Sequence, residues 1–366
     1  MRSPLVRSWL ALAVCGSALA EEPPVAPPPP RLAIHGFVDI YYGLNFNRPA
    51  DGASFAPGSG TTGKRAEELS LNIASVALSY APAPFGVELQ LIYGTGAEVL
   101  HAAEPARTAT GADVWRFVGR ASILYHQGDV TVEAGIYPSH VGYETAWSKD
   151  NWLYTRGWLG ENSPYYQTGI KVAYAFTPNL SAQLHVVNGW QLIGDNNEAK
   201  TIGTAIIWTS DAVTLSFNTL IGPETPGDNR HWRFYGDAIA AVQVTPAFGL
   251  AAELDAGVQQ RAVGDATGWQ GVGLFARYAL SDAVALAARG EIYHDPDGTI
   301  TGVGETAGEA SLAVEVKPAD GVSLKLEGRY DRSDAPVFAT HDADAAGKPI
   351  PTTDEWLVIA GAVASF

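Results

Sequence analysis

Cysteine is almost absent from this chain of 366 residues, which contains only Cys15. Because one cysteine cannot build a disulfide framework, stability must come from a large core or from a closed sheet. Charged residues are also scarce, at 17%, whereas aromatic residues make up 10% of the chain. Disordered chains have few aromatic residues and a high charge density, so this composition excludes intrinsic disorder.

Long hydrophobic runs and clusters of basic residues are missing as well. After residue 20, no stretch reaches the roughly 18 apolar residues that a membrane-spanning helix needs, which excludes a helical membrane protein. Asp and Glu number 39 against 23 Lys and Arg, for a net charge of −16. A surface that binds nucleic acid needs clustered basic side chains, so nucleic acid is excluded as a partner.

Motifs for catalysis and metal binding are scarce. The eight histidines occur singly, without the paired spacing of a metal site, so we expect no metal and no cofactor. No histidine has a serine two residues further on, the arrangement expected of an outer-membrane lipase, so we expect no enzyme and no catalytic residue. The stretch from Asp295 to Gly298 is interpreted as a surface turn rather than a calcium loop.

The N-terminal segment has the features of a secretory leader. Residues 1–20 combine two arginines, an apolar stretch and the small-residue sequence Ala18-Leu19-Ala20, which predicts a cleaved signal peptide. A lipoprotein cleavage site before Cys15 is the alternative. Residues 21–31 are rich in proline and predict an extended periplasmic spacer, because proline cannot join a sheet ladder.

Residues 32–366 are expected to form one all-β domain. In Val322 to Tyr330, apolar residues alternate with charged ones, so one face of the strand is apolar and the other polar. We find sixteen such segments: 33–46, 68–81, 85–100, 115–127, 129–140, 164–176, 180–192, 198–209, 211–221, 231–245, 248–260, 268–279, 282–294, 305–317, 321–332 and 354–366. Short turns alternate with long polar loops between them, which predicts a transmembrane antiparallel β-barrel of about 16 strands.

Aromatic residues near the ends of these segments favour a membrane barrel over the alternative, a soluble secreted β-sandwich or β-helix. We place at the short-turn ends Tyr80, Phe85, Tyr125, Phe176, Trp208, Phe248, Tyr278 and Phe366, and toward the long loops Tyr93, Trp115, Trp190, Trp232, Trp269, Tyr330 and Trp356. Amphipathic rings favour the membrane interface. The terminal Phe366 resembles the assembly signal of outer-membrane proteins, so the barrel-assembly machinery is an expected partner, with outer-membrane lipids.

The alternation also places charged side chains inside the barrel. On the face opposite the apolar one lie the basic residues Arg116, Arg120, Lys171, Arg233, Arg277, Arg289, Lys325 and Arg329 and the acidic residues Asp39, Glu88, Glu133, Asp237, Glu253, Asp255, Glu291, Glu309, Glu315 and Glu327. An arginine facing lipid at mid-membrane would cost about 2–4 kcal/mol. A barrel of this size is too wide for side chains to fill, so we expect water inside. The ten acids against eight bases predict a weak preference for cations.

Four blocks resemble the OmpL-like putative β-barrel porin family: residues 36–49, residues 150–156, residues 166–169, and residues 187–190 followed by 195–201. The resemblance extends over about residues 34–210. It implies an outer-membrane pore of a Gram-negative bacterium and supplies no catalytic residue. We expect a porin for passive diffusion of small hydrophilic solutes or ions. The alternative is a non-conducting structural or adhesive barrel that displays its loops. Porins of this strand number commonly form trimers, so a homotrimer is also expected.

The third long loop, residues 141–163, is the one that folds into the lumen in general porins. It carries five rings, which would be an exposed apolar patch on a solvated loop but could anchor it against an inner wall: Tyr143, Trp147, Trp152, Tyr154 and Trp158. We therefore predict a constriction there. The alternative is a loop lying on the surface. The predicted pore-lining residues are Glu144, Lys149, Asp150, Arg156 and Glu161 of the loop, with Arg116, Arg120, Arg289 and Arg329 of the wall.

Overall fold

The computed structural model describes residues 32–81, 84–104 and 114–366. The predicted signal peptide (1–20) and proline-rich spacer (21–31) lie outside the described residues. Within the described part, no helix is long and apolar enough to cross a membrane.

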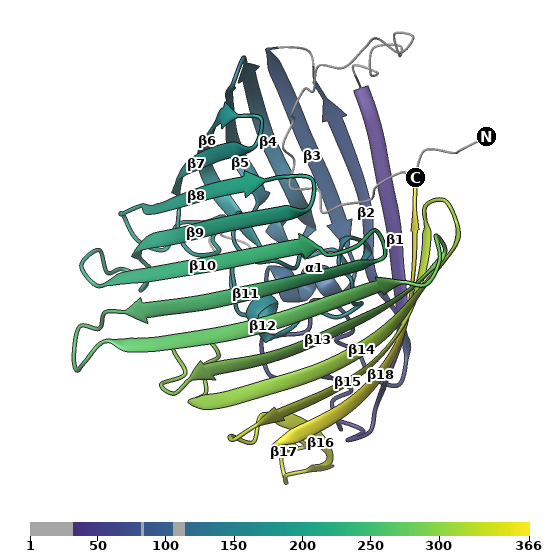
Figure 1. The fold of residues 1–366 in the computed structure, drawn as a ribbon. Coiled ribbons are helices and arrows are strands. Elements are labelled where there is room, and N and C mark those ends of the chain that lie inside the picture. The colour runs from purple at the N-terminus through teal and green to yellow at the C-terminus, as the bar shows by residue number, and fades with distance from the viewer. Residues whose placement is uncertain (1–31, 82–83, 105–113) are drawn as a thin grey trace.

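Sixteen antiparallel strands close into a barrel, as predicted (Figure 1). Neighbours in sequence pair around the ring, and β18 closes it against β1. The barrel strands are β1 (Leu32–Asn45), β2 (Leu69–Tyr80), β3 (Phe85–Tyr93), β4 (Val118–Gln127), β5 (Val130–Pro138), β6 (Tyr166–Thr177), β7 (Leu180–Val187), β8 (Thr201–Thr209), β9 (Val213–Pro223), β10 (Trp232–Gln243), β11 (Phe248–Gln259), β12 (Thr267–Ala279), β13 (Val284–Asp295), β14 (Glu305–Ala319), β15 (Val322–Ser333) and β18 (Asp354–Ser365).

The loops contain the remaining elements. Residues 333–353 were predicted as a plain loop, but they hold a separate hairpin of two short strands, β16 (Phe338–Ala343) and β17 (Pro349–Thr352). The described residues also contain four short helices: α1 (Thr95–Leu100), η1 (Val114–Phe117), η2 (Ser148–Asp150) and α2 (Trp158–Glu161).

The predicted strand 85–100 was wrong in its second half. Strand β3 ends at Tyr93, because Gly94 adopts a φ of 133°, which favours glycine. A Cβ at Gly94 would also lie 2.3 Å from the carbonyl oxygen of Asn72. The following helix α1 buries Ala97 in a cluster with Phe37 and Ile73 on the inner side of the barrel, so its apolar residues serve interior packing.

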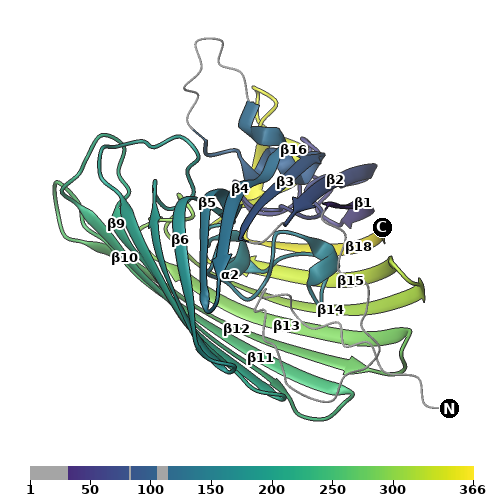
Figure 2. The ribbon, with the colours of Figure 1, turned by 90° about the horizontal axis from the view of Figure 1, so that it is seen from above.

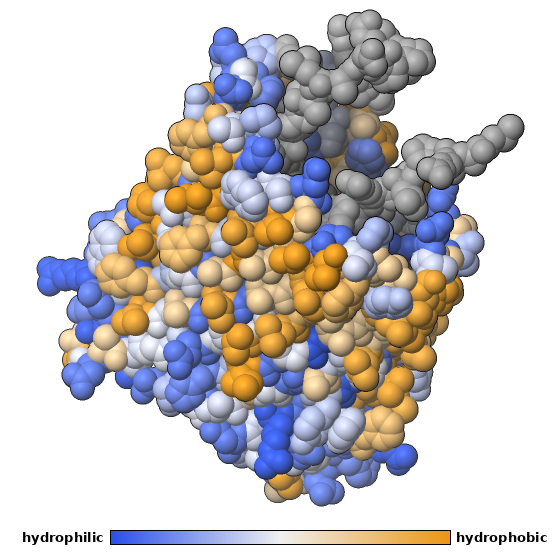
Figure 3. All heavy atoms as spheres, viewed as in Figure 1, coloured by the Kyte–Doolittle hydropathy of each residue, from blue (hydrophilic) through white to orange (hydrophobic). Residues whose placement is uncertain are grey.

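Side chains alternate between the two sides of the wall as predicted. In β15, Leu324 and Leu326 are exposed on the outside, whereas Lys325, Glu327 and Arg329 are buried on the inside. Figure 3 shows apolar side chains over much of the outer wall and polar ones gathering toward the lower end of that view. Burial of the charged set inside follows from the strand pleat.

The predicted aromatic belts are partly wrong. Tyr93 and Trp356 near the long loops are exposed on the outside, as expected. Trp269 instead points inward, is 3% exposed and stacks on Tyr235. Trp190 also packs on that inner cluster, and Trp115 packs on another. Strand parity and loop packing therefore decide where a ring points, and nearness to a strand end does not.

Candidate functional site

The loop between β5 and β6, residues 139–165, enters the barrel; it is called loop 3 below. Figure 2, seen from above, shows α2 of this loop inside the ring of strands. Loop 3 packs on the inner wall through Trp158 and Leu159, which join a buried cluster with Tyr137, Tyr235 and Tyr293. Its apolar groups therefore pack against rings that the strands present inward.

Main-chain N–H groups of loop 3 donate to carboxylates of the wall. The donors and acceptors are Gly142 to Asp237, Tyr143 to Glu253, Tyr154 and Thr155 to Glu327, and Leu159 to Glu291, at 2.6–3.1 Å. Buried peptide groups need such partners, since an unpaired one costs about as much as a lost hydrogen bond. The inner acids thus substitute for water along the loop.

Basic side chains of the wall bind the carbonyl groups of the same loop. Lys325 Nζ donates to the carbonyl oxygens of Ser148, Asn151 and Leu153. Arg329 donates to the carbonyl oxygen of Arg156. Hydrogen bonds with an ionised partner are about twice as strong as neutral ones. Charges of both signs on β13 to β15 therefore hold loop 3 against the wall.

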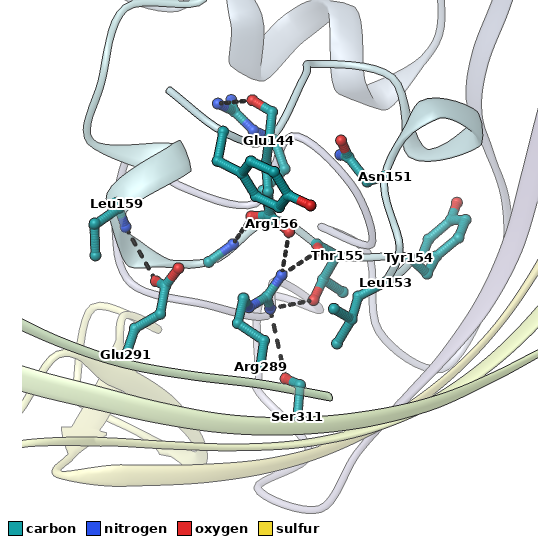
Figure 4. A network of polar contacts seen from close by, with 12 residues as sticks. Glu144, Asn151, Leu153, Tyr154, Thr155, Arg156, Leu159, Arg289, Glu291 and Ser311 are labelled. Carbon is teal, nitrogen blue, oxygen red and sulfur yellow. Dashed lines mark hydrogen bonds and ion pairs between the residues drawn. The ribbon is translucent and has the colours of Figure 1, made fainter. Parts of the chain in front are cut away.

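Arg289 of β13 lies at the centre of this network (Figure 4). It forms ion pairs with Glu309 at 2.6 Å and with Glu144 of loop 3 at 2.7 Å. Its guanidinium also donates to the carbonyl oxygen of Thr155 at 2.6 Å. The Arg289 side chain is 0% exposed, so these partners replace its entire hydration shell.

Asp39 of β1 holds the middle of loop 3. It accepts hydrogen bonds from Ser148 Oγ at 2.7 Å and from the Tyr154 hydroxyl at 2.8 Å. Loop 3 thereby spans the interior from β10 and β11 to β1.

The loop between β1 and β2, residues 46–68, folds over loop 3; it is called loop 1 below. Glu161 accepts hydrogen bonds from the main-chain N–H groups of Gly60 and Thr61 at 2.9 and 3.1 Å. Phe55 of loop 1 lies under the guanidinium of Arg329, 4.9 Å from its ring centroid. The two loops therefore form one packed layer within the barrel.

The predicted site residues lie in three different settings. Four of them are buried in the packed layer: Glu144, Arg156, Arg289 and Arg329. The prediction that these four side chains line open water was therefore wrong. Glu161 is half-buried beneath loop 1. Lys149 and Asp150 pair with each other at 2.8 Å and remain partly exposed.

The two wall arginines predicted on β4 differ. Arg120 lies on β4 and faces inward as expected. Arg116 lies in η1, ahead of the strand, and pairs with Glu98 of α1 at 3.1 Å, because β4 begins only at Val118. The expectation that Arg116 and Arg120 share one strand face was wrong.

The five rings predicted as loop anchors all contact protein. Tyr143, Tyr154 and Trp158 are at most 5% exposed, and Trp147 and Trp152 are half-buried. Trp147 packs on Phe37, and Trp152 packs edge-on against Tyr143.

Sequence reasoning missed Thr155, whose hydroxyl bonds to Glu327 and receives a hydrogen bond from Arg329. No local pattern marks a single threonine in this way.

Burial changes the acid–base properties of loop groups. It lowers the pKa of His140 from 6.5 to about 4, so the ring is neutral at pH 7. Its Nε2 lies 3.0 Å from the carbonyl oxygen of Thr219. Burial, together with the Asp39 charge, raises the pKa of the Tyr154 hydroxyl, which therefore stays a hydrogen-bond donor.

Several partly exposed charges lie side by side on the inner wall at β3, β4 and β6. The exposed side-chain fractions are 27% for Arg120, 22% for Glu88 and 21% for Lys171. Arg120 and Lys171 both pair with the buried Glu133, each at 2.5 Å. These three exposed groups, on β3, β4 and β6, are called the charged strip below.

A closed sixteen-stranded barrel with an apolar outside and a charged inside defines a porin-like β-barrel. The chain belongs to the family described as putative beta-barrel porin-2, OmpL-like, whose profile matches residues 31–366. This confirms the family resemblance of the four sequence blocks. No curated protein sequence matches the chain.

Solved porin structures share the fold. The anion-selective porin from Comamonas acidovorans is similar with a TM-score of 0.60 and 10% identity, over 92% of this chain and 99% of that one. The outer-membrane OmpT of Vibrio cholerae gives 0.59 and 10%, over 92% and 97%. The outer membrane channel DcaP of Acinetobacter baumannii gives 0.57 and 10%, over 92% and 97%. At such identities the likeness concerns the fold alone.

Proposed function

We propose that this protein is an outer-membrane channel of a Gram-negative bacterium for passive diffusion of small hydrophilic solutes or ions, narrowed by loop 3. The proposal rests on the position of loop 3. Buried contacts with strands from β1 to β15 hold this loop across the interior of the barrel. A loop that served only for display would have no need of this internal set of donors and acceptors. Membership of a porin family supports the same role.

The path for solutes runs along the charged strip. Arg289 and Glu327 are covered by loop 3 and are 0% exposed, whereas Arg120, Glu88 and Lys171 still reach water. Charged walls that remain hydrated are what a diffusing polar solute requires, because they substitute for part of its hydration shell.

Single-channel recording in planar bilayers tests this proposal on the purified, refolded protein. Stepwise conductance that grows with salt concentration is the expected result. Bilayers that contain folded protein and show no steps would favour the alternative, a non-conducting barrel that displays its loops.

Opposite shifts of ion selectivity are expected from two neutral substitutions in the charged strip. Arg120→Gln should move the reversal potential in a salt gradient toward cations, and Glu88→Gln should move it toward anions. The wild-type preference is expected to be weak, because Arg120 and Lys171 are balanced by Glu88 and Glu133. Asp342→Asn in the exposed hairpin loop is the control, since salt screens distant charges. Equal reversal potentials in all four proteins would contradict the proposed path.

Deletion of Phe366 is expected to lower the yield of assembled barrel. Phe366 extends the pairing of β18 with β1 through two main-chain hydrogen bonds with Gly36, at 2.9 and 3.1 Å. Its ring packs on Gly36. A Cβ atom added at Gly36 would lie only 2.4 Å from a ring carbon of Phe366. Without Phe366, the main-chain N–H and C=O groups of Gly36 would lose their partners at the seam that closes the barrel. The measurement is the folded fraction in outer membranes, and an unchanged fraction would count against the assembly role.

We also propose a homotrimer, because the solved structures that share this fold include a trimer form of Vibrio cholerae OmpT. Exposed apolar side chains of the outer wall, such as Leu254 and Leu274, could be covered by a second copy. Cross-linking in mild detergent is expected to give a three-chain species. Recovery of single chains alone would remove the proposal.

A further inference from the structure

Three carboxylates inside the barrel lack any basic partner among the described residues. Asp237 of β10 lies directly opposite Asp255 of β11, and Glu253 lies two residues before Asp255 on the same face. All three side chains are buried, at 0 to 4% exposed. Like charges directly opposite each other on a sheet repel, and a buried charge without a partner is costly.

A second cluster of acids on the inner wall, Glu291 and Glu309, has the basic partner that the first cluster lacks. Glu309 of β14 also lies opposite an acid, Glu291, but Arg289 compensates it at 2.6 Å. No described Lys or Arg forms such an ion pair with Asp237, Glu253 or Asp255. No described basic side chain neutralises these three carboxylates, so either bound protons or a bound cation must do so.

The free oxygen atoms of the three carboxylates converge. Asp237 Oδ2 accepts from Gly142 and Asn218, and Glu253 Oε1 accepts from Tyr143. The other oxygens, Asp237 Oδ1, Glu253 Oε2 and Asp255 Oδ1, have no hydrogen-bond partner. One ligand atom from each carboxylate lies within 4.8 Å of the others.

Two buried phenols point to a ligand independently of the acids. The hydroxyls of Tyr235 and Tyr293 have no partner at hydrogen-bond geometry, and the side chains are 3% and 1% exposed. Tyr235 lies two residues before Asp237 on the inner face of β10, and the Tyr293 ring lies over Gly271, the residue of β12 that pairs with Asp255. The two phenols bring neutral oxygen atoms to the same place.

We propose that Asp237, Glu253 and Asp255 bind a calcium ion inside the barrel. Calcium takes six to eight oxygen ligands at about 2.3–2.6 Å, so oxygens on opposite sides of it lie roughly 4.6–5.2 Å apart. The three ligand atoms all lie within 4.8 Å of one another, which is compatible with this spacing. A buried set of protein oxygens suits calcium better than magnesium, which gives up its bound waters reluctantly. Histidine spacing gave no sign of the site, because its ligands are carboxylates brought together by strand pairing.

The ion also bears on loop 3. Gly142 and Tyr143, at the start of the loop, bind the same carboxylates that hold the ion. The ion fixes these carboxylates in the position in which they accept the loop. This connection extends the proposed channel function, but binding of the ion does not depend on conduction.

Terbium luminescence tests the site in the full chain, refolded in detergent after treatment with EDTA. Terbium substitutes for calcium and is excited by nearby tyrosine and tryptophan rings. We expect emission that saturates at one terbium per chain, that calcium displaces, and that magnesium displaces only at much higher concentration. Asp255→Asn should abolish it, whereas Glu315→Gln, which removes a carboxylate paired with Arg277, should leave it unchanged.

The thermal midpoint provides a measurement that does not depend on the variants. Calcium should raise the midpoint of the wild-type protein above its value in EDTA, because a ligand that binds only the folded state stabilises it. Absence of saturable emission, equal emission from Asp255→Asn, or an unchanged midpoint would each overturn the calcium site. These readouts are made without a bilayer, so a barrel that fails to conduct would not affect them.

Discussion

Removal of residues 147–158 is expected to raise single-channel conductance several-fold. The deleted segment contains Trp147, Trp152, Tyr154 and Trp158, together with the main-chain groups that Lys325 and Glu327 bind. Without it, Arg289, Lys325, Glu327 and Arg329 become exposed to water, and the cross-section open to ions widens from the charged strip to most of the lumen. Conductance follows that cross-section.

The control for this experiment is a deletion of similar kind outside the barrel. Residues 344–347 form the exposed tip of the β16 and β17 hairpin, and their removal should leave conductance unchanged. Both proteins must first show the mobility of a folded barrel on gels. Wild-type conductance in a correctly folded protein lacking residues 147–158 would disprove the constriction.

Strand alternation made the barrel wall predictable from sequence. The pleat gives each residue a side, so the inward direction of Lys325, Glu327 and Arg329 follows from their neighbours Leu324 and Leu326. Short turns and long loops then indicated the antiparallel order. Trp269 could have been placed by the same rule, because it shares its side with Phe275 and not with Leu274.

Contacts between loop and wall could not be predicted in this way. Thr155 and Glu327 are 172 residues apart, and they meet because closure of the barrel brings β15 across from loop 3. No local pattern encodes that distance. The same applies to Asp237 and Asp255, whose opposition depends on the register of β10 with β11. Charged residues on the inner face were therefore predicted to meet water, whereas the loop supplies peptide groups in its place.

Arg289→Met is expected to lower the free energy of unfolding by about 3–5 kcal/mol, the cost of leaving buried charges without their partner. Glu309 and Glu144 would lose their ion pairs, and the Thr155 carbonyl would lose its donor. Methionine retains much of the side-chain volume, so the loss reports on charge more than on a cavity. Urea unfolding in lipid vesicles, followed by tryptophan fluorescence, measures it.

Arg277→Met is the matched control. It removes an arginine from the same inner wall, but this arginine is partly open to water. Arg277 is 30% exposed and pairs with Glu315 at 3.0 Å. An ion pair open to water contributes at most about 1 kcal/mol, so this variant should unfold close to the wild-type urea concentration. Arg289→Met should also raise conductance, since loop 3 loses the contact at its centre, whereas Arg277→Met should leave the loop in place. Equal losses of stability in the two variants would show that the packed layer does not depend on the Arg289 network.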